Sequence, residues 1–466
     1  MATSTLDAIV EAAASAEVHR RFGTVVRTSG EMAIAAGINL RPSELAFIED
    51  PAGRMLAAEC AGTHGVEAHL AMLDRGTIVT GSRVIAAGRM ASAPTGRALL
   101  GRVLDGLGRP IDGGGELVGT RQVPVHAEPP GPLDREPIMR CLPSGVRAID
   151  GFLTLGRGQR VGIFAGSGVG KSTLLGMLAR GTAADVTVIA LIGERGREVR
   201  DFIEHDLGLD ALRNCVVVTS TGDNPAAMRR CAANTATAIA ESFRADGLDV
   251  LLLFDSLTRV AMAQREIGLA AGEPPTTRGY PPSVFSLLPH LMERAGPSRE
   301  GTMTAIYTVL VDGDDMDEPI ADISRATLDG HIVLKRSLAS AGHYPPIDVL
   351  GSVSRLFDRV ASPAHKAAAR NLRELMAAHN DARDLISIGA YVEGADPAVD
   401  RSVELLPAIN GFLRQEPHDV ADYDEAVEAI CGIDPSLASA VEPGGPGSEV
   451  INATFAPTLE TPGDAP

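Results

Sequence analysis

Short runs of apolar, partly β-branched residues alternate with helical patterns through the middle of the chain. These runs lie at residues 161–164, 186–192, 216–219, 250–254 and 304–309. Strands that alternate with helices form parallel βαβ units, and strands that are apolar throughout belong to a sheet covered on both faces. The pattern therefore predicts a central α/β domain with a parallel sheet.

The pattern changes on either side of this domain. Residues 21–88 contain short β-rich runs punctuated by Gly, Pro and Asp, which is typical of a small β-barrel or sandwich. After about Pro363 the β signal fades, and an Ala-, Leu- and Arg-rich helical pattern continues to about Leu437. At roughly 150 residues per domain, the 466 residues suit about three domains.

The two ends of the chain differ from these domains. Leu6, Ile9, Val10 and Ala13 have helical spacing, which predicts a short amphipathic helix, either a frayed terminus or a docking helix for a regulator. The last residues are rich in Pro and Gly without periodicity, which is typical of a disordered tail. We therefore predict five segments: an N-terminal helix (1–20), a β-barrel (21–90), an α/β domain that begins with a linker (91–362), a helical domain (363–440) and a tail (441–466).

The charge of the chain bears on its partners. Lys and Arg total 42 against 60 Asp and Glu, which gives a net charge of −18 and opposes binding to phosphate backbones. Aromatic residues are 3% of the chain and Trp is absent, so few rings are available to stack on bases. Nucleic acid is therefore not an expected partner.

Cysteine usage and hydropathy bear on the compartment. The five cysteines are scattered without a C-x-x-C pair, as in proteins whose thiols stay reduced in the cytoplasm. No apolar run reaches the ~18–20 residues of a membrane span, and Asp7 and Glu11 interrupt any secretion signal. We expect a cytoplasmic protein that is attached at most peripherally to a larger structure.

A glycine-rich segment follows the first predicted strand of the α/β domain and precedes a helical pattern. This order directs backbone N–H groups and the positive end of a helix at phosphate groups. Lys171 then reaches the β- and γ-phosphates, and the Ser172 hydroxyl coordinates Mg²⁺; Ala165 stands where the strict pattern has Gly. The nucleotide-binding residues predicted here are Ala165, Gly166, Ser167, Gly168, Val169, Gly170, Lys171, Ser172 and Thr173.

Two carboxylates at the ends of predicted strands add candidate chemistry. Asp255 ends the run 249–255, where the second carboxylate of such a site holds the Mg²⁺ shell directly or through water. Glu194 follows the run 186–192, at the carboxyl end where ligands sit in open α/β sheets. Glu194 is a candidate for orienting the attacking water; the alternative is a solvated residue at the start of a Glu- and Arg-rich helix.

Several blocks of the chain resemble one family. GIFAGSGVGKSTLLGMLAR, ALIGERGREVRDFIEHDLG, LLLFDSLTRVAMAQREIG and LDGHIVLKRSLASAGHYPPIDVLGSVSR are similar to the ATPases of flagellar and virulence-type III protein export. This family is homologous to the catalytic subunit of the rotary ATP synthases. The resemblance implies an N-terminal β-barrel, a central RecA-like α/β P-loop ATPase domain and a C-terminal α-helical domain, with ATP and Mg²⁺ as cofactors. Export ATPases often carry Ala at the position of Ala165.

The resemblance also implies roles for individual residues. It assigns Glu194 to water activation, Arg195 to a position near the γ-phosphate and Glu198 to the outer Mg²⁺ shell, and Arg259 is similar to an arginine that braces the site. Arg355 matches an arginine finger that acts on the nucleotide of the neighbouring subunit, so the isolated subunit is expected to be a poor enzyme.

Two aromatic residues are candidates for the base. The resemblance assigns Tyr344 to stacking on adenine, and Phe412 to closing the same pocket from the helical domain. Simple core packing is the alternative for both rings.

Three kinds of protein share the phosphate loop: export ATPases, rotary ATP synthase subunits and hexameric RNA translocases. The helical domain reads GAYVEGADPAVDRSVELLP in place of the acidic DELSEED segment of the rotary catalytic subunit, and Glu194 stands where the non-catalytic rotary subunit has Gln. Negative charge and scarce aromatic residues oppose an RNA translocase. We therefore interpret the chain as an export ATPase, preferably of the flagellar branch, with a virulence (injectisome) ATPase as the alternative.

The export interpretation implies an assembly. It predicts a homohexameric ring on the cytoplasmic face of the inner membrane, peripherally attached beneath the export gate. Its other expected partners are regulator or stator proteins, stalk proteins, export chaperones and export substrates, without nucleic acid. A ring platform whose docking matters more than its turnover is the non-enzymatic alternative.

Overall fold

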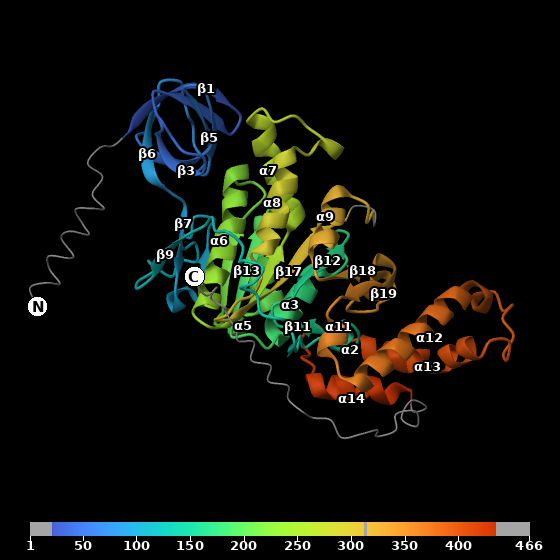
Figure 1. The fold of residues 1–466 in the computed structure, drawn as a ribbon. Coiled ribbons are helices and arrows are strands. Elements are labelled where there is room, and N and C mark those ends of the chain that lie inside the picture. Colours follow the sequence, from blue (N-terminus) through green and yellow to red (C-terminus); the bar gives the residue numbers. More distant parts are fainter. Residues whose placement is uncertain (1–20, 312–314, 435–466) are drawn as a thin grey trace, which may run out of the picture.

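The computed structural model describes residues 21–311 and 315–434, so the predicted N-terminal helix (1–20) and tail (441–466) lie outside the described residues. A β-barrel, a mixed α/β domain and a helical domain follow one another along the chain (Figure 1). The structure thereby confirms the predicted fold class.

Six strands close into an antiparallel barrel in the order β1-β2-β5-β4-β3-β6. Ile48, Leu70 and Cys60 are among the apolar side chains buried inside it. Closure leaves the barrel without an unpaired edge that could template aggregation. The strands are β1 (Phe22–Ser29), β2 (Met32–Ala36), β3 (Glu44–Glu49), β4 (Met55–His64), β5 (Glu67–Met72) and β6 (Arg83–Met90).

A nine-stranded sheet forms the centre of the second domain, in the order β19-β18-β12-β17-β15-β13-β14-β8, with β16 paired to β17. The strands from β18 to β8 are parallel, whereas β19 is an antiparallel edge strand. Each apolar run predicted as a strand lies in this sheet. The strands are β8 (Val103–Leu104), β12 (Arg160–Ala165), β13 (Val186–Ile192), β14 (Cys215–Ser220), β15 (Asp249–Asp255), β16 (Gly296–Pro297), β17 (Thr302–Leu310), β18 (Gly330–Leu334) and β19 (Ile347–Ser354).

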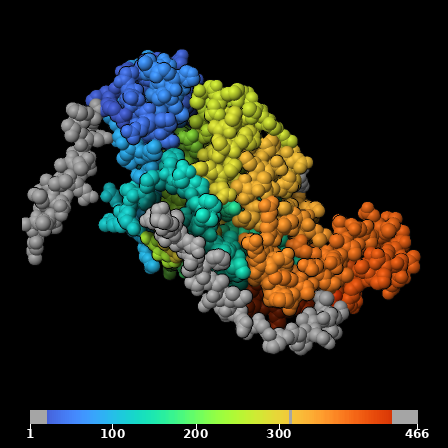
Figure 2. Space-filling model, viewed as in Figure 1, coloured from blue at the N-terminus to red at the C-terminus, as the bar shows by residue number. Residues whose placement is uncertain are grey.

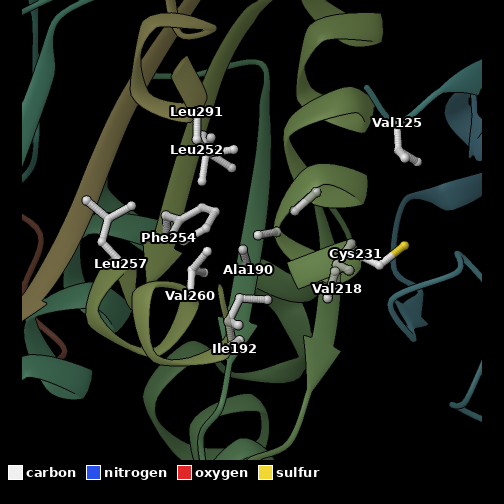
Figure 3. Close-up of a cluster of buried hydrophobic side chains, with 14 of the residues drawn as sticks. Val125, Ala190, Ile192, Val218, Cys231, Leu252, Phe254, Leu257, Val260 and Leu291 are labelled. Carbon is white, nitrogen blue, oxygen red and sulfur yellow. The ribbon is translucent and has the colours of Figure 1, made fainter. Parts of the chain in front are cut away.

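Helices cover both faces of the sheet because its strands alternate their side chains between two apolar layers. In β13, Ala190 and Ile192 face the layer of α6 to α9, as Figure 3 shows for the side of α6 to α8, whereas Ile189 and Leu191 face the layer of α3. The first layer comprises α6 (Ala226–Ala245), α7 (Leu257–Ala270), α8 (Pro282–Glu293) and α9 (Pro319–Thr327). The second comprises α2 (Arg147–Phe152), α3 (Lys171–Gly181), α4 (Gly196–Asp201), the π-helix η2 (Phe202–Leu207) and α5 (Leu209–Leu212).

Smaller elements connect these layers. A two-stranded sheet of β7 and β9 lies in the linker between the barrel and the central sheet, and β10 pairs with β11 before the phosphate loop. The elements are β7 (Ser92–Thr95), η1 (Arg97–Leu99), β9 (Arg121–Pro124), β10 (Cys141–Leu142), β11 (Leu155–Gly156), η3 (Thr277–Gly279), α10 (Arg336–Ser340) and α11 (Phe357–Val360).

The C-terminal domain is helical and shares the second apolar layer through residues such as Leu372 and Ile409. Each helix is preceded by an N-cap residue, Ser362, Asp396 or Asp422, whose side chain accepts hydrogen bonds from backbone N–H groups of the first turn. The α12–α13 hairpin projects from the body (Figures 1 and 2). The helices are α12 (Pro363–Ser387), α13 (Pro397–Leu413) and α14 (Tyr423–Ile433).

Within residues 21–311 and 315–434, none of the helices combines the length and apolar content that crossing a membrane would require.

Candidate active site

The glycine-rich loop connects the inner strand β12 to α3. Gly168 and Gly170 have φ angles of 74° and 107°, in the left-handed region that glycine adopts without a steric penalty. The strand residue Ala165 is buried, whereas Ser167 and Ser172 are exposed at the mouth of the loop. The loop therefore presents the N-terminus of α3, with its free N–H groups and positive dipole end, to a phosphate-bearing ligand.

Three predicted site residues meet in front of this loop. The Lys171 ammonium contacts Asp255 Oδ1 and lies 3.2 Å from Glu194 Oε1. Their side chains are 12%, 4% and 14% exposed, respectively, so the charges interact with little screening by water. Burial alone would lower the pKa of Lys171, but the carboxylates of Asp255 and Glu194 more than offset burial and raise that pKa. Lys171 is therefore a permanent cation between two carboxylates.

The sheet order explains this meeting. β17 separates β12 from β15, and β13 lies on the far side of β15. Asp255 and Glu194 therefore lie at the carboxyl ends of the parallel strands, as the phosphate loop does. Their strands β15 and β13 are two and three strands away from β12. Lys171, the first residue of α3, reaches back across these strand ends to both carboxylates.

β17 contributes a residue that sequence reasoning missed. The buried Thr308 hydroxyl donates a 2.7 Å hydrogen bond to Asp255 Oδ1. Thr308 has no recognisable motif around it, and only the position of β17 between β12 and β15 brings it to the site.

Ser172, Glu194, Glu198 and Asp255 line a cavity of ≈20 Å³ together with apolar side chains of the adjoining elements. Hydroxyl and carboxylate oxygens are the donors that Mg²⁺ prefers, and Mg²⁺ is commonly held by one or two carboxylates with substrate phosphates and water. In the described part of the chain, no group of three or more His, Cys, Asp or Glu residues could hold a metal by itself. The donor set thus fits a magnesium ion that arrives with a phosphate ligand.

Arg195 lies apart from these residues. Its side chain is 87% exposed, and its guanidinium is 3.4 Å from the half-exposed carboxylate of Glu198. Arg195 is the residue before α4, so its side chain lies in solvent beside the mouth of the site.

Arg355 lies at the opposite end of the parallel strands, the end at which they begin. The antiparallel pairing of β18 and β19 places Ser354 opposite Gly330, at the amino end of β18, whereas the phosphate loop follows the carboxyl end of the neighbouring parallel strand β12. The exposed Arg355 side chain donates a hydrogen bond to the carbonyl oxygen of Arg325 at 3.2 Å. Roughly 15 Å of strand therefore separates this residue from the site of its own chain.

The structure places Tyr344 and Phe412 in different surroundings. The Tyr344 side chain is 49% exposed. Its loop is adjacent to the phosphate loop: a side chain on Gly170 would place its Cβ 3.7 Å from Pro346 Cδ. Phe412 is only 7% exposed and packs edge-on against Phe152, with 6.1 Å between the ring centroids. Tyr344 is thus available to a ligand, whereas the Phe412 ring is buried against Phe152.

Two arginines support the loops of the site. Arg336, which sequence reasoning missed, donates a 3.0 Å hydrogen bond to the carbonyl oxygen of Ser167 in the phosphate loop. Arg259 packs closely against the turn before Glu194: a side chain on Gly193 would place its Cβ only 2.8 Å from Arg259 Cβ. This contact is consistent with the bracing role that the resemblance implies for Arg259.

Comparisons with known proteins identify the family. Residues 145–354 match the nucleotide-binding domain model of the ATP synthase alpha/beta family, and residues 361–431 match the T3SS EscN ATPase C-terminal domain. The chain is 48% identical to the flagellum-specific ATP synthase of Bacillus subtilis, over 89% of this chain and 95% of that protein. The chain belongs to the type III export ATPase family. This export ATPase is also 48% identical to the type 3 secretion system ATPase of Xanthomonas euvesicatoria, over 90% and 96% of the two chains.

Solved structures support the same assignment. The export ATPase is similar to the assembled ATPase EscN of the enteropathogenic E. coli type III secretion system, with a TM-score of 0.84 and 43% identity over 88% of this chain and 99% of that chain. A structure of EscN in complex with its central stalk EscO is similar at a TM-score of 0.82. Flagellar and secretion-system relatives have equal identity to this chain, so identity does not favour either branch.

Proposed function

We propose that this export ATPase hydrolyses ATP at the site around Lys171 and couples hydrolysis to protein export. The observation that carries the proposal is the contact of the Lys171 ammonium with both Asp255 and Glu194. Residues 165–173 bind the phosphate groups, and Tyr344 stacks on adenine beside them. Phe412 is retained in this proposal only as a residue that supports the pocket from the core.

Hydrolysis requires an attacking water and neutralisation of charge. The Glu194 carboxylate accepts a hydrogen bond from the water and orients its oxygen in line with the γ-phosphorus. The new O–P bond forms as the bond to the β–γ bridging oxygen breaks, and the water proton leaves through Glu194. Lys171 and Arg195 neutralise the phosphoryl oxygens. Mg²⁺, when bound, shields the same oxygens; Ser172 and Asp255 would hold it, with Glu198 outside them.

Arg355 completes the site of a neighbouring subunit in this proposal. Its exposure and its position at the opposite end of the parallel strands support a role in trans, and EscN is described as an assembled ATPase. We infer a homohexameric ring in which every interface pairs one phosphate loop with the finger of the next chain.

The ring serves protein export. EscN binds a central stalk, and by analogy we infer a stalk protein, regulator or stator proteins, chaperones and export substrates as partners. Its place is the cytoplasmic face of the inner membrane beneath the export gate, and RNA has no role in turnover. We retain the flagellar branch as the preferred system and the injectisome as the alternative. Deletion of the gene, followed by an assay of filament export, would distinguish the two systems.

Glu194→Gln tests the proposed chemistry. The amide keeps the size of the side chain but cannot polarise water as a carboxylate does, so turnover falls at least about 100-fold while ATP binding persists. Glu204→Gln is the control, because Glu204 pairs with Arg200 at the surface of η2. ATPase rates and equilibrium nucleotide binding are measured for both variants. Unchanged turnover in Glu194→Gln removes Glu194 from its proposed role.

A further inference from the structure

The loop between α13 and α14 inserts the buried residue Gln415 between the helical and central domains. Gln415 is 5% exposed, and its backbone N–H donates a 2.9 Å hydrogen bond to the carbonyl oxygen of Tyr344. The helical domain therefore contacts the loop of the proposed adenine-stacking residue directly, through the backbone.

The Gln415 side chain fixes where that N–H group lies. Its Oε1 accepts a 2.9 Å hydrogen bond from the backbone of Arg147, and its Nε2 donates to the carbonyl oxygens of Gly145 and Asp419 at 2.8 and 2.9 Å. Both amide protons and the amide oxygen thus have partners, which defines a single orientation of this side chain.

The segment that Gln415 holds packs against the end of α3 that lies away from the phosphate loop. A Cβ on Gly145 would lie 2.8 Å from Gly181 Cα, at the last residue of α3, and α3 begins at the phosphate loop. Arg147 Nε in turn donates a 2.9 Å hydrogen bond to the carbonyl oxygen of Phe412, at the end of α13. Gln415 therefore connects the Tyr344 loop, through its backbone N–H, with residues 145–147, through its side chain, and those residues contact α3 and α13.

We propose that Gln415 is a positioning residue for the adenine-binding loop, and that base binding and the position of the helical domain are coupled through it. The inference rests on the proposed function, because it takes Tyr344 as the residue that stacks on adenine. Coupling of this kind is reciprocal: an ATP molecule that orders the Tyr344 loop also orders the loop that follows α13, and movement of the helical domain changes affinity for the base.

Gln415→Met tests the side chain, because methionine keeps its length and volume but loses all three hydrogen bonds. Gln159→Met is the matched control: Gln159 is also buried, accepts a hydrogen bond from Gly156 N–H and donates to Asp329 and Ser354, remote from Tyr344. Equilibrium binding is measured with two probes, ATP and inorganic tripolyphosphate, which reports the phosphate loop without a base.

We expect Gln415→Met to weaken ATP binding about tenfold, the size of one lost base–aromatic stacking contact, and to leave tripolyphosphate binding unchanged. Gln159→Met leaves both affinities unchanged. In a double-mutant cycle, Gln415→Met adds nothing to Tyr344→Ala, because both changes remove the same contact with the base. Equal ATP affinity of the two methionine variants, additive effects with Tyr344→Ala, or an equal loss for both probes overturns the inference.

A second measurement needs no variant and remains decisive if Gln415→Met does not fold. In the wild-type protein, ATP slows amide hydrogen exchange in residues 412–421, which include the Gln415 N–H, and tripolyphosphate does not. Equal protection by both probes, or by neither, overturns the coupling. Failure of the proposed function has a different signature, because Lys171→Ala or Tyr344→Ala then leaves ATP binding intact.

Discussion

Asp255 depends on the Thr308 hydroxyl from the neighbouring strand for its orientation. Thr308→Val removes the 2.7 Å hydrogen bond to the carboxylate while keeping the shape of the side chain. Loss of one buried hydrogen bond destabilises the fold by about 1 kcal/mol, and a carboxylate that keeps only its Lys171 contact is held less firmly for Mg²⁺. We expect the Mg²⁺ concentration for half-maximal turnover to rise several-fold.

Thr304→Val is the control for this prediction. Thr304 lies on the same strand β17, is also buried, and accepts a 2.8 Å hydrogen bond from Gly158 instead of contacting Asp255. Titration of turnover with Mg²⁺ for both variants separates the two sites. An equal rise in the Mg²⁺ concentration for half-maximal turnover in both variants would assign the effect to β17 as a whole.

Residues with a local signature were the ones that could be predicted. Lys171 follows a glycine-rich turn, and Glu194 and Asp255 follow apolar runs, so each was a candidate before the structure brought them together. Thr308 and Gln415 act through partners that are distant in the sequence, and no spacing rule relates β17 to β15 or the end of α13 to Tyr344. Their contributions required the strand order and the domain packing.

At the scale of elements, a buried ion pair joins the barrel to the central domain. Glu59 on β4 is 1% exposed, with Oε2 at 3.0 Å from Arg230 of α6 and Oε1 at 3.6 Å from His126 of the linker. Burial alone would raise the pKa of Glu59, but the charge of Arg230, with His126, lowers it to about 2. A depressed pKa means that the ionised carboxylate stabilises the fold above its ordinary value of 4.5 and loses this effect as the pH falls towards 2.

Glu59→Gln should therefore destabilise the protein by about 3 kcal/mol at pH 7, because Arg230 keeps a buried charge without a counter-ion. The difference in unfolding free energy between wild type and variant narrows below about pH 4.5, as the Glu59 carboxylate becomes protonated in the unfolded chain. Urea unfolding from about pH 7 to below about pH 4.5 measures this difference. Glu67→Gln on β5, whose carboxylate is 3.6 Å from Arg27 at the surface, is the control and should change stability by less than about 1 kcal/mol. A difference that does not vary with pH would contradict the ionic origin.

Element types followed from periodicity, whereas element order did not. The apolar runs predicted the strands β12 to β15 and β17 because a sheet covered on both faces leaves no polar alternation. The edge strand β8 comes from the linker at the start of the α/β domain, and β19 is antiparallel. Both depend on pairing with distant strands, for which a single sequence has no local signal.

At the scale of the whole molecule, the sheet separates the proposed arginine finger from the phosphate loop of the same chain. Lys171 lies at the carboxyl ends of the parallel strands and Arg355 at their amino ends. A chain therefore cannot bring its own Arg355 to its own phosphate loop without unfolding the sheet. With Arg355 in its proposed role, turnover is a property of the assembly, and ATPase activity should rise with protein concentration as subunits associate.

Mixing two inactive variants tests this arrangement. Arg355→Ala keeps an intact site but lacks the finger, which is worth about 10³–10⁵ in rate, whereas Lys171→Ala keeps the finger but lacks the phosphate-loop cation. In a ring assembled at random from equal amounts, about one quarter of the interfaces join the intact site of one variant to the intact finger of the other. We expect partial recovery of ATPase activity in the mixture, measured with ring assembly verified by sedimentation. A chain carrying both substitutions, mixed with Lys171→Ala, has no complete interface and should stay inactive. No recovery in assembled mixed rings would show that Arg355 does not act across the interface.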